Sequence, residues 1–170
     1  FAGLALFVFV RKNVRAMKPT IKPVLETDLP AICAIEQRAF CDPWPPEAFS
    51  DFVIKNGWLL DLDGQVAGYI FYHFVIDEAV IINFAVDPAY QGQNYGQFLL
   101  SASMQLLINR GVKYFFLDVR RSNLPAIGLY HKVGFQSLGF RKDYYHDPVE
   151  DAIVMGLNIP EKQREVSDDL

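Results

Sequence analysis

The sequence has few cysteines and histidines, and it has no apolar run long enough to cross a bilayer. It contains two cysteines, Cys33 and Cys41, and three histidines that do not lie at metal-ligand spacing. Neither a disulfide framework nor a metal site is therefore predicted, and a reducing, cytoplasmic setting is the simplest interpretation. A bilayer span needs about 20 apolar residues, whereas the first apolar run covers residues 1–10. We expect no membrane partner.

The segment before Met17 differs in composition from the rest of the chain. An apolar run precedes a basic stretch, residues 11–15, which is the reverse of the order in a secretory signal. Two interpretations stay open: the end of a membrane anchor, or sequence upstream of a start at Met17. The second is favoured because a domain pattern begins just after Met17. We expect a leader outside the domain, a single domain and a polar tail, at residues 1–16, 17–160 and 161–170.

Acidic residues outnumber basic ones in the predicted domain. The chain has 16 lysines and arginines and 20 aspartates and glutamates, and three of the basic residues lie in the stretch 11–15. Residues 17–170 therefore hold 13 basic and 20 acidic residues, a net charge of −7. Phosphate neutralisation needs a basic face, so direct nucleic-acid binding is not expected. A basic protein segment is the better partner.

From Thr20 onward, strand and helix patterns alternate without internal repeats or a linker. Asp63-Gly64 fits a two-residue type I′ turn between strands, and either Thr27 or Asp28 fits the N-cap of the first helix. The apolar run 79–86 predicts a central strand. The pattern predicts a mixed α/β sheet flanked by helices. Expected strands are 20–25 at an edge, 58–62, 65–74, 79–86, 113–119, 134–141 and 152–159, and expected helices are 29–39, 47–54, 96–110 and 123–133.

The stretch from Asn83 to Leu100 is the most informative part of the sequence. A predicted strand ends at Asp87-Pro88, a turn that contains glycine follows, and a helix begins. Backbone N–H groups converge at such a helix N-terminus, where an anion such as a pyrophosphate can bind. The turn lacks the features of a Walker loop and of a dinucleotide fingerprint. Taken alone, it is read more simply as an ordinary strand-to-helix turn.

Together with residues 117–135, LDVRRSNLPAIGLYHKVGF, this stretch resembles the GNAT acetyltransferases. The resemblance extends from about Thr20 to Ile159. Within that superfamily the chain is more similar to the RimI-type enzymes, which acetylate the N-terminal alanine of the eighteenth protein of the small ribosomal subunit. The residues that carry this narrower resemblance are Ile35-Glu36-Gln37-Arg38-Ala39, Pro43-Trp44, Asp77-Glu78-Ala79, Asn83 to Pro88, Asn123 to Tyr130, Asp143-Tyr144-Tyr145 and Glu150-Asp151-Ala152-Ile153.

The resemblance implies the GNAT acyl-CoA N-acyltransferase fold, a mixed and mostly antiparallel sheet flanked by helices, with acetyl-CoA as cosubstrate and no metal. Asn123 would hold the cofactor near its thioester, and Tyr130 would donate a proton to the departing thiolate. A tyrosine suits this step because it is protonated at physiological pH, although a tyrosine packed in the core is the alternative. The other implied cofactor-binding residues are Phe84, Ala85 and Val86 along the pantetheine arm, and Gly92, Gln93, Asn94, Tyr95, Gly96 and Gln97 around the pyrophosphate.

The sequence departs from the RimI-type pattern at Asp118, where that pattern has a glutamate as proton acceptor. The aspartate side chain is shorter by one methylene, or about 1.5 Å. We expect Asp118 to act through an ordered water, which general-base geometry permits. The alternative is a carboxylate at the end of a strand that pairs with Arg120 or Arg121.

A second departure is Asn94, which stands where the loop pattern has its first glycine. Asparagine is the usual non-glycine residue in left-handed geometry, so we expect the turn to form but to bind the cofactor more weakly. The loop has no lysine or arginine. Phosphate binding would rest on backbone N–H groups, with Ser101 or Ser103 as helpers and Arg121 or Lys132 as the cation.

The candidates for lining a peptide groove are Trp44, Tyr144 and Tyr145, with ordinary packing as the alternative. Asp42 and Glu47 could form an acidic entrance, although a solvated surface is the favoured interpretation. The histidines, His73, His131 and His146, lie on three separate predicted elements and are interpreted as surface or packing residues. Neither cysteine has a basic environment that would lower its pKa, so an acyl-cysteine route is not expected.

These features predict a cytoplasmic enzyme, monomeric by preference, that transfers acetyl directly to a protein N-terminal α-amine in a ternary complex. A ribosomal protein is the expected substrate. The alternatives that stay open are acetylation of another peptide, a lysine or a small-molecule amine, and a non-catalytic module that binds acyl-CoA.

Overall fold

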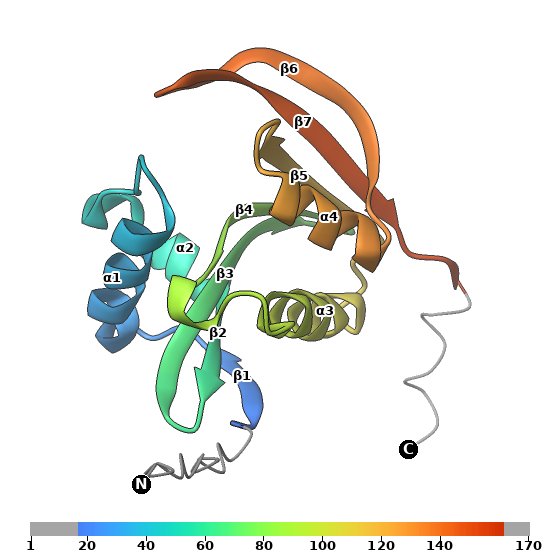
Figure 1. Cartoon of the computed structure of the whole chain (residues 1–170). Coiled ribbons are helices and arrows are strands. Elements are labelled where there is room, and N and C mark those ends of the chain that lie inside the picture. Colours follow the sequence, from blue (N-terminus) through green and yellow to red (C-terminus); the bar gives the residue numbers. More distant parts are fainter. Residues whose placement is uncertain (1–16, 162–170) are drawn as a thin grey trace, which may run out of the picture.

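The computed structural model describes residues 17–161, so the predicted leader and nearly all of the predicted tail lie outside the described residues. Seven strands form one sheet in the order β1-β2-β3-β4-β5-β7-β6 (Figure 1). The strands are β1 Pro19–Pro23, β2 Gly57–Leu62, β3 Gln65–Val75, β4 Glu78–Val86, β5 Tyr114–Arg120, β6 Gln136–His146 and β7 Val149–Asn158. The helices are α1 Leu29–Ala39, α2 Asp51–Lys55, α3 Tyr95–Ile108 and α4 Leu124–Val133, with single 3₁₀ turns at Glu26–Asp28, Pro46–Ala48 and Pro88–Tyr90.

The sheet is mixed and mostly antiparallel, as predicted. Only the pairing of β4 with β5 is parallel among the described strands. β4 lies in the middle of the sheet and β1 at its edge, in agreement with the sequence. The β2–β3 hairpin turns at Asp63 and Gly64, whose φ angles of 51° and 92° are the positive pair that a type I′ turn requires.

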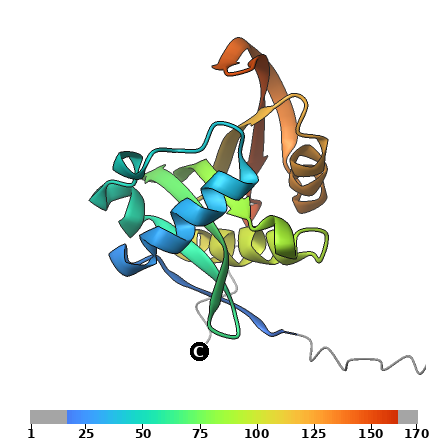
Figure 2. The same ribbon diagram turned by 60° about the vertical axis from the view of Figure 1, so that its left-hand side comes forward.

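Helices cover the two faces of the sheet, and each face has its own core (Figure 2). On the α1–α2 face, Ile32 and Ile35 pack against Tyr69 and Phe71 of β3. On the α3–α4 face, the larger core holds residues of α3 and α4 against β2 to β5 and β7. The candidate site residues are also distributed over both faces, with some on the α3–α4 face and others on the α1–α2 face. No helix within residues 17–161 is long and apolar enough to cross a membrane.

Two local predictions were wrong. The helix expected over 47–54 is a 3₁₀ turn followed by α2, because Phe49 between them has φ −84° and ψ 65°, outside the helical region. The N-cap prediction for α1 is confirmed at Asp28. The Asp28 carboxylate accepts from the N–H of Leu25 and makes no capping bond to α1.

The second error concerns the closing strands. β6 runs on to His146 and β7 begins at Val149, so the two strands form a long hairpin. Its outer half is polar and exposed, and it projects above the sheet (Figure 1). Without a buried face, this segment has none of the apolar alternation by which a strand is recognised.

Candidate active site

β4 and β5 separate halfway along their length. They pair only from Glu78 with Tyr114 to Ile81 with Leu117, although β4 continues to Val86 and β5 to Arg120. β4 stays paired with β3 as far as Val86. Among the described strands, none therefore pairs with the β5-facing edge of β4 over residues 82–86. This is the edge on which the predicted pantetheine contacts of Phe84, Ala85 and Val86 lie.

A β-bulge accompanies this separation. Asn83 pairs with Phe71 and Ile81 pairs with Tyr72, so Ile82 is the extra residue in β4. A bulge bends its strand and increases the local twist. The bulge therefore provides a physical reason for β4 to turn away from β5 at this point.

The predicted phosphate turn connects β4 to α3. Gly92 and Asn94 both take left-handed conformations, with φ angles of 74° and 63°, which confirms the geometry expected for Asn94. The Asn94 side chain makes no capping hydrogen bond to α3. The first N–H groups of a helix have no intrahelical partner. At Tyr95, Gly96 and Gln97 they are thus left to an anion at the positive end of the helix dipole.

A surface hollow of about 610 Å³ lies beside this turn, and Asn94, Gln97, Phe98, Ser101, Ala102 and Lys132 line it. Of the predicted helpers and cations, Ser101 and Lys132 line this hollow, whereas Ser103 and Arg121 make contacts elsewhere. Ser103 is fully buried, and its hydroxyl is bonded to that of Tyr72 at 2.8 Å. Arg121 forms an ion pair with Asp151 at 3.8 Å instead. Lys132 is therefore the cation that could hold a phosphate here.

Tyr130 lies on α4 next to the open edge of β4. Its ring centroid is 6.4 Å from that of Phe84 and 5.6 Å from that of Phe135, and the residue is 6% exposed. Burial, and then the nearby Tyr145, raise the pKa of Tyr130 above its ordinary value of 10.0. The hydroxyl therefore keeps its proton at neutral pH and can act as a donor.

Asn123 is the N-cap of α4, and its Oδ1 accepts from the N–H of Ala126 at 3.2 Å. This cap leaves the Nδ2 group as a donor for a ligand. The side chain is exposed at the start of α4. The position of Asn123 is therefore compatible with its predicted contact with the cofactor.

Asp118 faces the opposite side of the sheet from Tyr130. Its neighbours Leu117 and Val119 belong to the core of the α3–α4 face, so the intervening side chain points to the α1–α2 face. The carboxylate pairs with Arg141 of β6, with Nε 3.2 Å from Oδ1. This contact is an ion pair by distance only, because Oδ1 is buried and no donor within residues 17–161 is aligned to hydrogen-bond with it.

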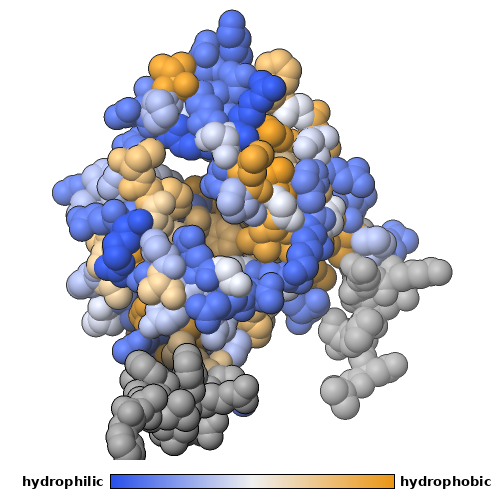
Figure 3. All heavy atoms as spheres, in the orientation of Figure 1, coloured by the Kyte–Doolittle hydropathy of each residue, from blue (hydrophilic) through white to orange (hydrophobic). Residues whose placement is uncertain are grey.

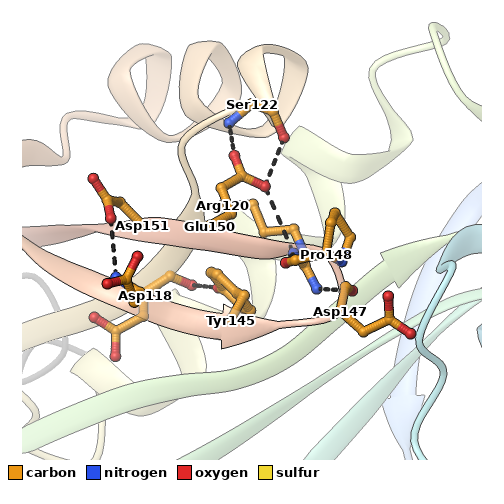
Figure 4. Close-up of polar contacts among 9 residues, drawn as sticks. Asp118, Arg120, Ser122, Tyr145, Asp147, Pro148, Glu150 and Asp151 are labelled. Atoms are coloured by element: carbon orange, nitrogen blue, oxygen red, sulfur yellow. Dashed lines mark hydrogen bonds and ion pairs between the residues drawn. The ribbon is translucent and has the colours of Figure 1, made fainter.

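The alternative partners proposed for Asp118 were wrong. Arg120 forms an ion pair with Glu150 at 3.6 Å, and it donates to the carbonyl oxygens of Asp147 and Pro148 at 2.9 and 3.1 Å (Figure 4). Arg121 pairs with Asp151. Asp118 does pair with an arginine, as the sequence suggested, but this arginine is Arg141 of β6.

Arg120 also holds the hairpin residues that were predicted to bind peptide. Its guanidinium lies 4.2 Å from the ring centroid of Tyr145, whose hydroxyl donates to the carbonyl oxygen of Asp118 at 3.3 Å (Figure 4). Burial, and then the charge of Asp118, raise the pKa of Tyr145 to about 12. Hydrogen bonds from Ser122 keep the pKa of Glu150 below its usual 4.5. The hairpin is therefore tied to β5 at neutral pH.

The predicted peptide-binding residues come from two separate elements. Trp44 lies in the loop between α1 and α2, and its ring packs on Phe49 with centroids 5.8 Å apart. Tyr144 and Tyr145 lie on the hairpin, with Tyr144 43% exposed. Figure 3 shows a hollow with an apolar floor between these two elements. Asp42 and Glu47 are exposed on the same loop as Trp44.

The remaining candidates lie outside the site. The histidines are exposed on β3, α4 and β6. Both cysteines are free, and burial raises the pKa of the Cys33 thiol, which disfavours the thiolate. Within residues 17–161, no group of three or more His, Cys, Asp or Glu side chains could hold a metal.

Sequence reasoning did not find the contacts of three side chains that shape the site. Arg141 pairs with Asp118, Arg120 organises the hairpin, and Glu36 accepts from the N–H of Trp44. Glu36 is a glutamate in an otherwise apolar helix stripe, buried to 1% exposure. A charged residue on the buried face of an amphipathic helix is the one signal that could have found it.

Comparisons with known proteins agree with this geometry. The profile of the Acetyltransferase (GNAT) family matches residues 29–135. The chain is 41% identical over 144 residues to the ribosomal protein bS18-alanine N-acetyltransferase of Escherichia coli strain K12, covering 82% of this chain and 97% of the relative. The protein of the same name from Salmonella typhimurium is 40% identical over 146 residues, with the same coverage.

Solved structures show the same fold. The crystal structure of the ribosomal-protein-S18-alanine N-acetyltransferase from Escherichia coli matches with a TM-score of 0.77 at 40% identity, covering 84% of this chain and 94% of that chain. Ard1 from Thermoplasma volcanium matches with a TM-score of 0.77 at 24% identity, covering 84% of this chain and 99% of that chain. The separated strands, the uncapped helix and the extended family match lead to one conclusion: this chain belongs to the GNAT family of acetyltransferases.

Proposed function

We propose that this protein transfers the acetyl group of acetyl-CoA to the N-terminal alanine of ribosomal protein bS18, in the cytoplasm. The acceptor is inferred from relatives that are 40–41% identical to this chain and carry this activity in their names. The match covers 97% of the length of each of these relatives. The observation that carries the chemistry is the placement of Tyr130 and Asp118 on opposite faces of the sheet, next to the gap between β4 and β5.

This placement supports direct transfer in a ternary complex. Acetyl-CoA lies along β4 on the α3–α4 face, and the peptide enters from the α1–α2 face. The amine nitrogen attacks the thioester carbon through the gap, and a carbon–nitrogen bond forms as the carbon–sulfur bond breaks. Tyr130 gives its proton to the leaving thiolate, and Asp118 accepts the amine proton through a water.

The cofactor is held mainly by the main chain. Backbone groups of Phe84, Ala85 and Val86 pair with the pantetheine arm as an added strand would. The pyrophosphate sits at the uncapped N-terminus of α3, where Lys132 supplies the cation. Asn123 directs its Nδ2 group toward the thioester end.

An α-amine suits an aspartate base that reaches only through water. With a pKa of about 7.7–8.0, roughly a fifth to a third of such amines are neutral at pH 7.4, against roughly one in a thousand lysines with a pKa near 10.4. A base that acts through a water can therefore suffice for this nucleophile. The acidic domain, with a net charge of −7 over residues 17–170, also favours the approach of a basic peptide.

The test is thiol release from acetyl-CoA with a synthetic peptide that has the bS18 N-terminal sequence and a free alanine. We expect release with this peptide, a mass increase of one acetyl group at its α-amine, and no release with the same peptide blocked at the N-terminus. Release with the blocked peptide would move the acceptor to a lysine. Cofactor binding without release on any amine would favour a non-catalytic module.

A further inference from the structure

The loop that carries Trp44 has almost no backbone hydrogen-bond donors. Its sequence is Pro43-Trp44-Pro45-Pro46, and proline has no N–H group. Trp44 therefore provides the only backbone donor of these four residues. That donor is used, because the N–H of Trp44 donates to Oε2 of Glu36 at 2.9 Å. A side chain of α1 holds the loop where strand or helix bonds cannot.

The other oxygen of the same carboxylate reaches β4. Oε1 of Glu36 accepts from Nδ2 of Asn83 at 2.5 Å and from the hydroxyl of Tyr69. Burial, and then Glu36, raise the pKa of Tyr69, so this phenol stays a donor. Glu36 is 1% exposed and Asn83 is 8% exposed. A carboxylate is stable at such burial only when donors satisfy its oxygens, and these donors come from three different elements.

Asn83 stands where β4 becomes the open edge. It follows the bulged Ile82 and precedes Phe84, the first of the residues expected along the pantetheine arm. The Glu36 carboxylate thus connects the Trp44 loop to the start of the open edge of β4. Because both oxygens are engaged, a shift of either segment breaks a hydrogen bond to the other.

We propose that Glu36 is a positioning residue that holds the Trp44 loop in register with the open edge of β4, so that the acceptor amine meets the thioester. The inference rests on the proposed function, since it gives the loop a role in binding the acceptor. Glu36 is 1% exposed, so its role is to position the loop and not to contact either substrate. A displacement of about 1 Å at a reacting centre can cost about a hundredfold in rate, so loss of this link acts on acceptor use before it acts on cofactor binding.

The test is Glu36→Gln, which keeps the shape but offers one carbonyl oxygen where two acceptors are needed. Its NH₂ group must then face the N–H of Trp44, or else the donors Asn83 and Tyr69. Hydrogen–deuterium exchange reads the link directly, because the Trp44 amide is the only exchangeable backbone proton of residues 43–46. We expect this amide to exchange at least about tenfold faster. We also expect the acceptor KM to rise about tenfold, with the KM for acetyl-CoA changed less than about twofold.

Two phenylalanine variants keep the test valid if Glu36→Gln folds poorly. Tyr69→Phe removes one donor to Glu36, and we expect a smaller rise in acceptor KM of about threefold. Tyr72→Phe is the matched control: Tyr72 lies on the same strand and is equally buried, but it is bonded to Ser103 on the opposite face. We expect it to leave Trp44 exchange and acceptor KM unchanged.

The proposal is overturned if Trp44 exchange in Glu36→Gln stays within about twofold of wild type. It is also overturned if exchange accelerates while acceptor KM and kcat do not move, or if Tyr72→Phe has the same effect as Tyr69→Phe. A wild-type chain that releases no thiol with the alanine peptide defeats the proposed acceptor. The exchange data still decide whether Glu36 holds the loop.

Discussion

The two faces of the sheet are built in different ways around the same gap. On the α3–α4 face, the main chain makes the site: the open edge of β4, the left-handed Gly92 and Asn94, and the uncapped start of α3. On the α1–α2 face, pairs of side chains from different segments make it: Glu36 with Asn83, Arg141 with Asp118, and Arg120 with Glu150. The first face should therefore tolerate side-chain changes that the second does not.

Tyr130 is a side chain on the α3–α4 face that is proposed to take part in the chemistry, so Tyr130→Phe should have the largest effect. We expect kcat to fall about 10²- to 10⁴-fold, because the leaving thiolate loses its proton donor, while the KM for acetyl-CoA changes little because the ring remains. Since burial raises the pKa of Tyr130, the wild-type kcat should not decline from loss of this proton up to about pH 10. Steady-state thiol release across pH measures both. A kcat within about threefold of wild type would remove Tyr130 from the role of proton donor.

Asp118→Asn tests the other face, and the expected loss in kcat is about tenfold to a hundredfold. The loss should be greatest below the amine pKa, where the neutral nucleophile is scarce, and should narrow above it. Asp61→Asn is the matched control, because Asp61 pairs with Lys22 at 2.8 Å near the edge of the sheet. An unchanged turnover and pH profile in Asp118→Asn would remove Asp118 from the role of base.

Lys132→Ala asks how far the α3–α4 face depends on charge. We expect the KM for acetyl-CoA to rise about fivefold at low salt, and the difference from wild type to shrink as salt screens the phosphate contact. Arg121→Ala is the comparison, and it should leave this KM unchanged because Arg121 pairs with Asp151. The reverse result would place the phosphates at the start of α4 rather than beside α3.

Asn94→Gly should have the smallest effect, in the direction of improvement. Glycine takes a positive φ without the steric cost that a side chain meets, so we expect affinity for coenzyme A to rise about twofold to threefold in titration calorimetry. Unimproved affinity would show that Asn94 does more than supply a backbone conformation.

The same division explains what could be predicted from the sequence. The Asp63-Gly64 hairpin, the left-handed Asn94 and the central β4 follow from local residue preferences and apolar patterns, and the structure confirms them. The helix expected at 47–54 failed because one residue, Phe49, leaves the helical region. The family resemblance supplied the candidate site residues where local patterns were silent.

The side-chain pairs could not be predicted in this way. Asp118 and Arg141 lie on strands that are separated by β7 in the sheet, and nothing in the local sequence selects Arg141 over the adjacent Arg120. Glu36 meets Asn83 across 47 positions of the chain. Such contacts depend on how the elements pack, so they become visible only when the fold is known.

The separation of β4 from β5 also bears on the stability of the protein. An unpaired strand edge is ordinarily a template on which another chain can add, but this one opens in the middle of the sheet and is flanked by helices and a hairpin. A ligand that pairs with this edge binds the native state and not the unfolded chain, so it stabilises the fold. Ligand at a hundred times its dissociation constant raises the free energy of unfolding by about 2.7 kcal/mol. The resistance of this enzyme to unfolding is therefore coupled to the supply of its cosubstrate.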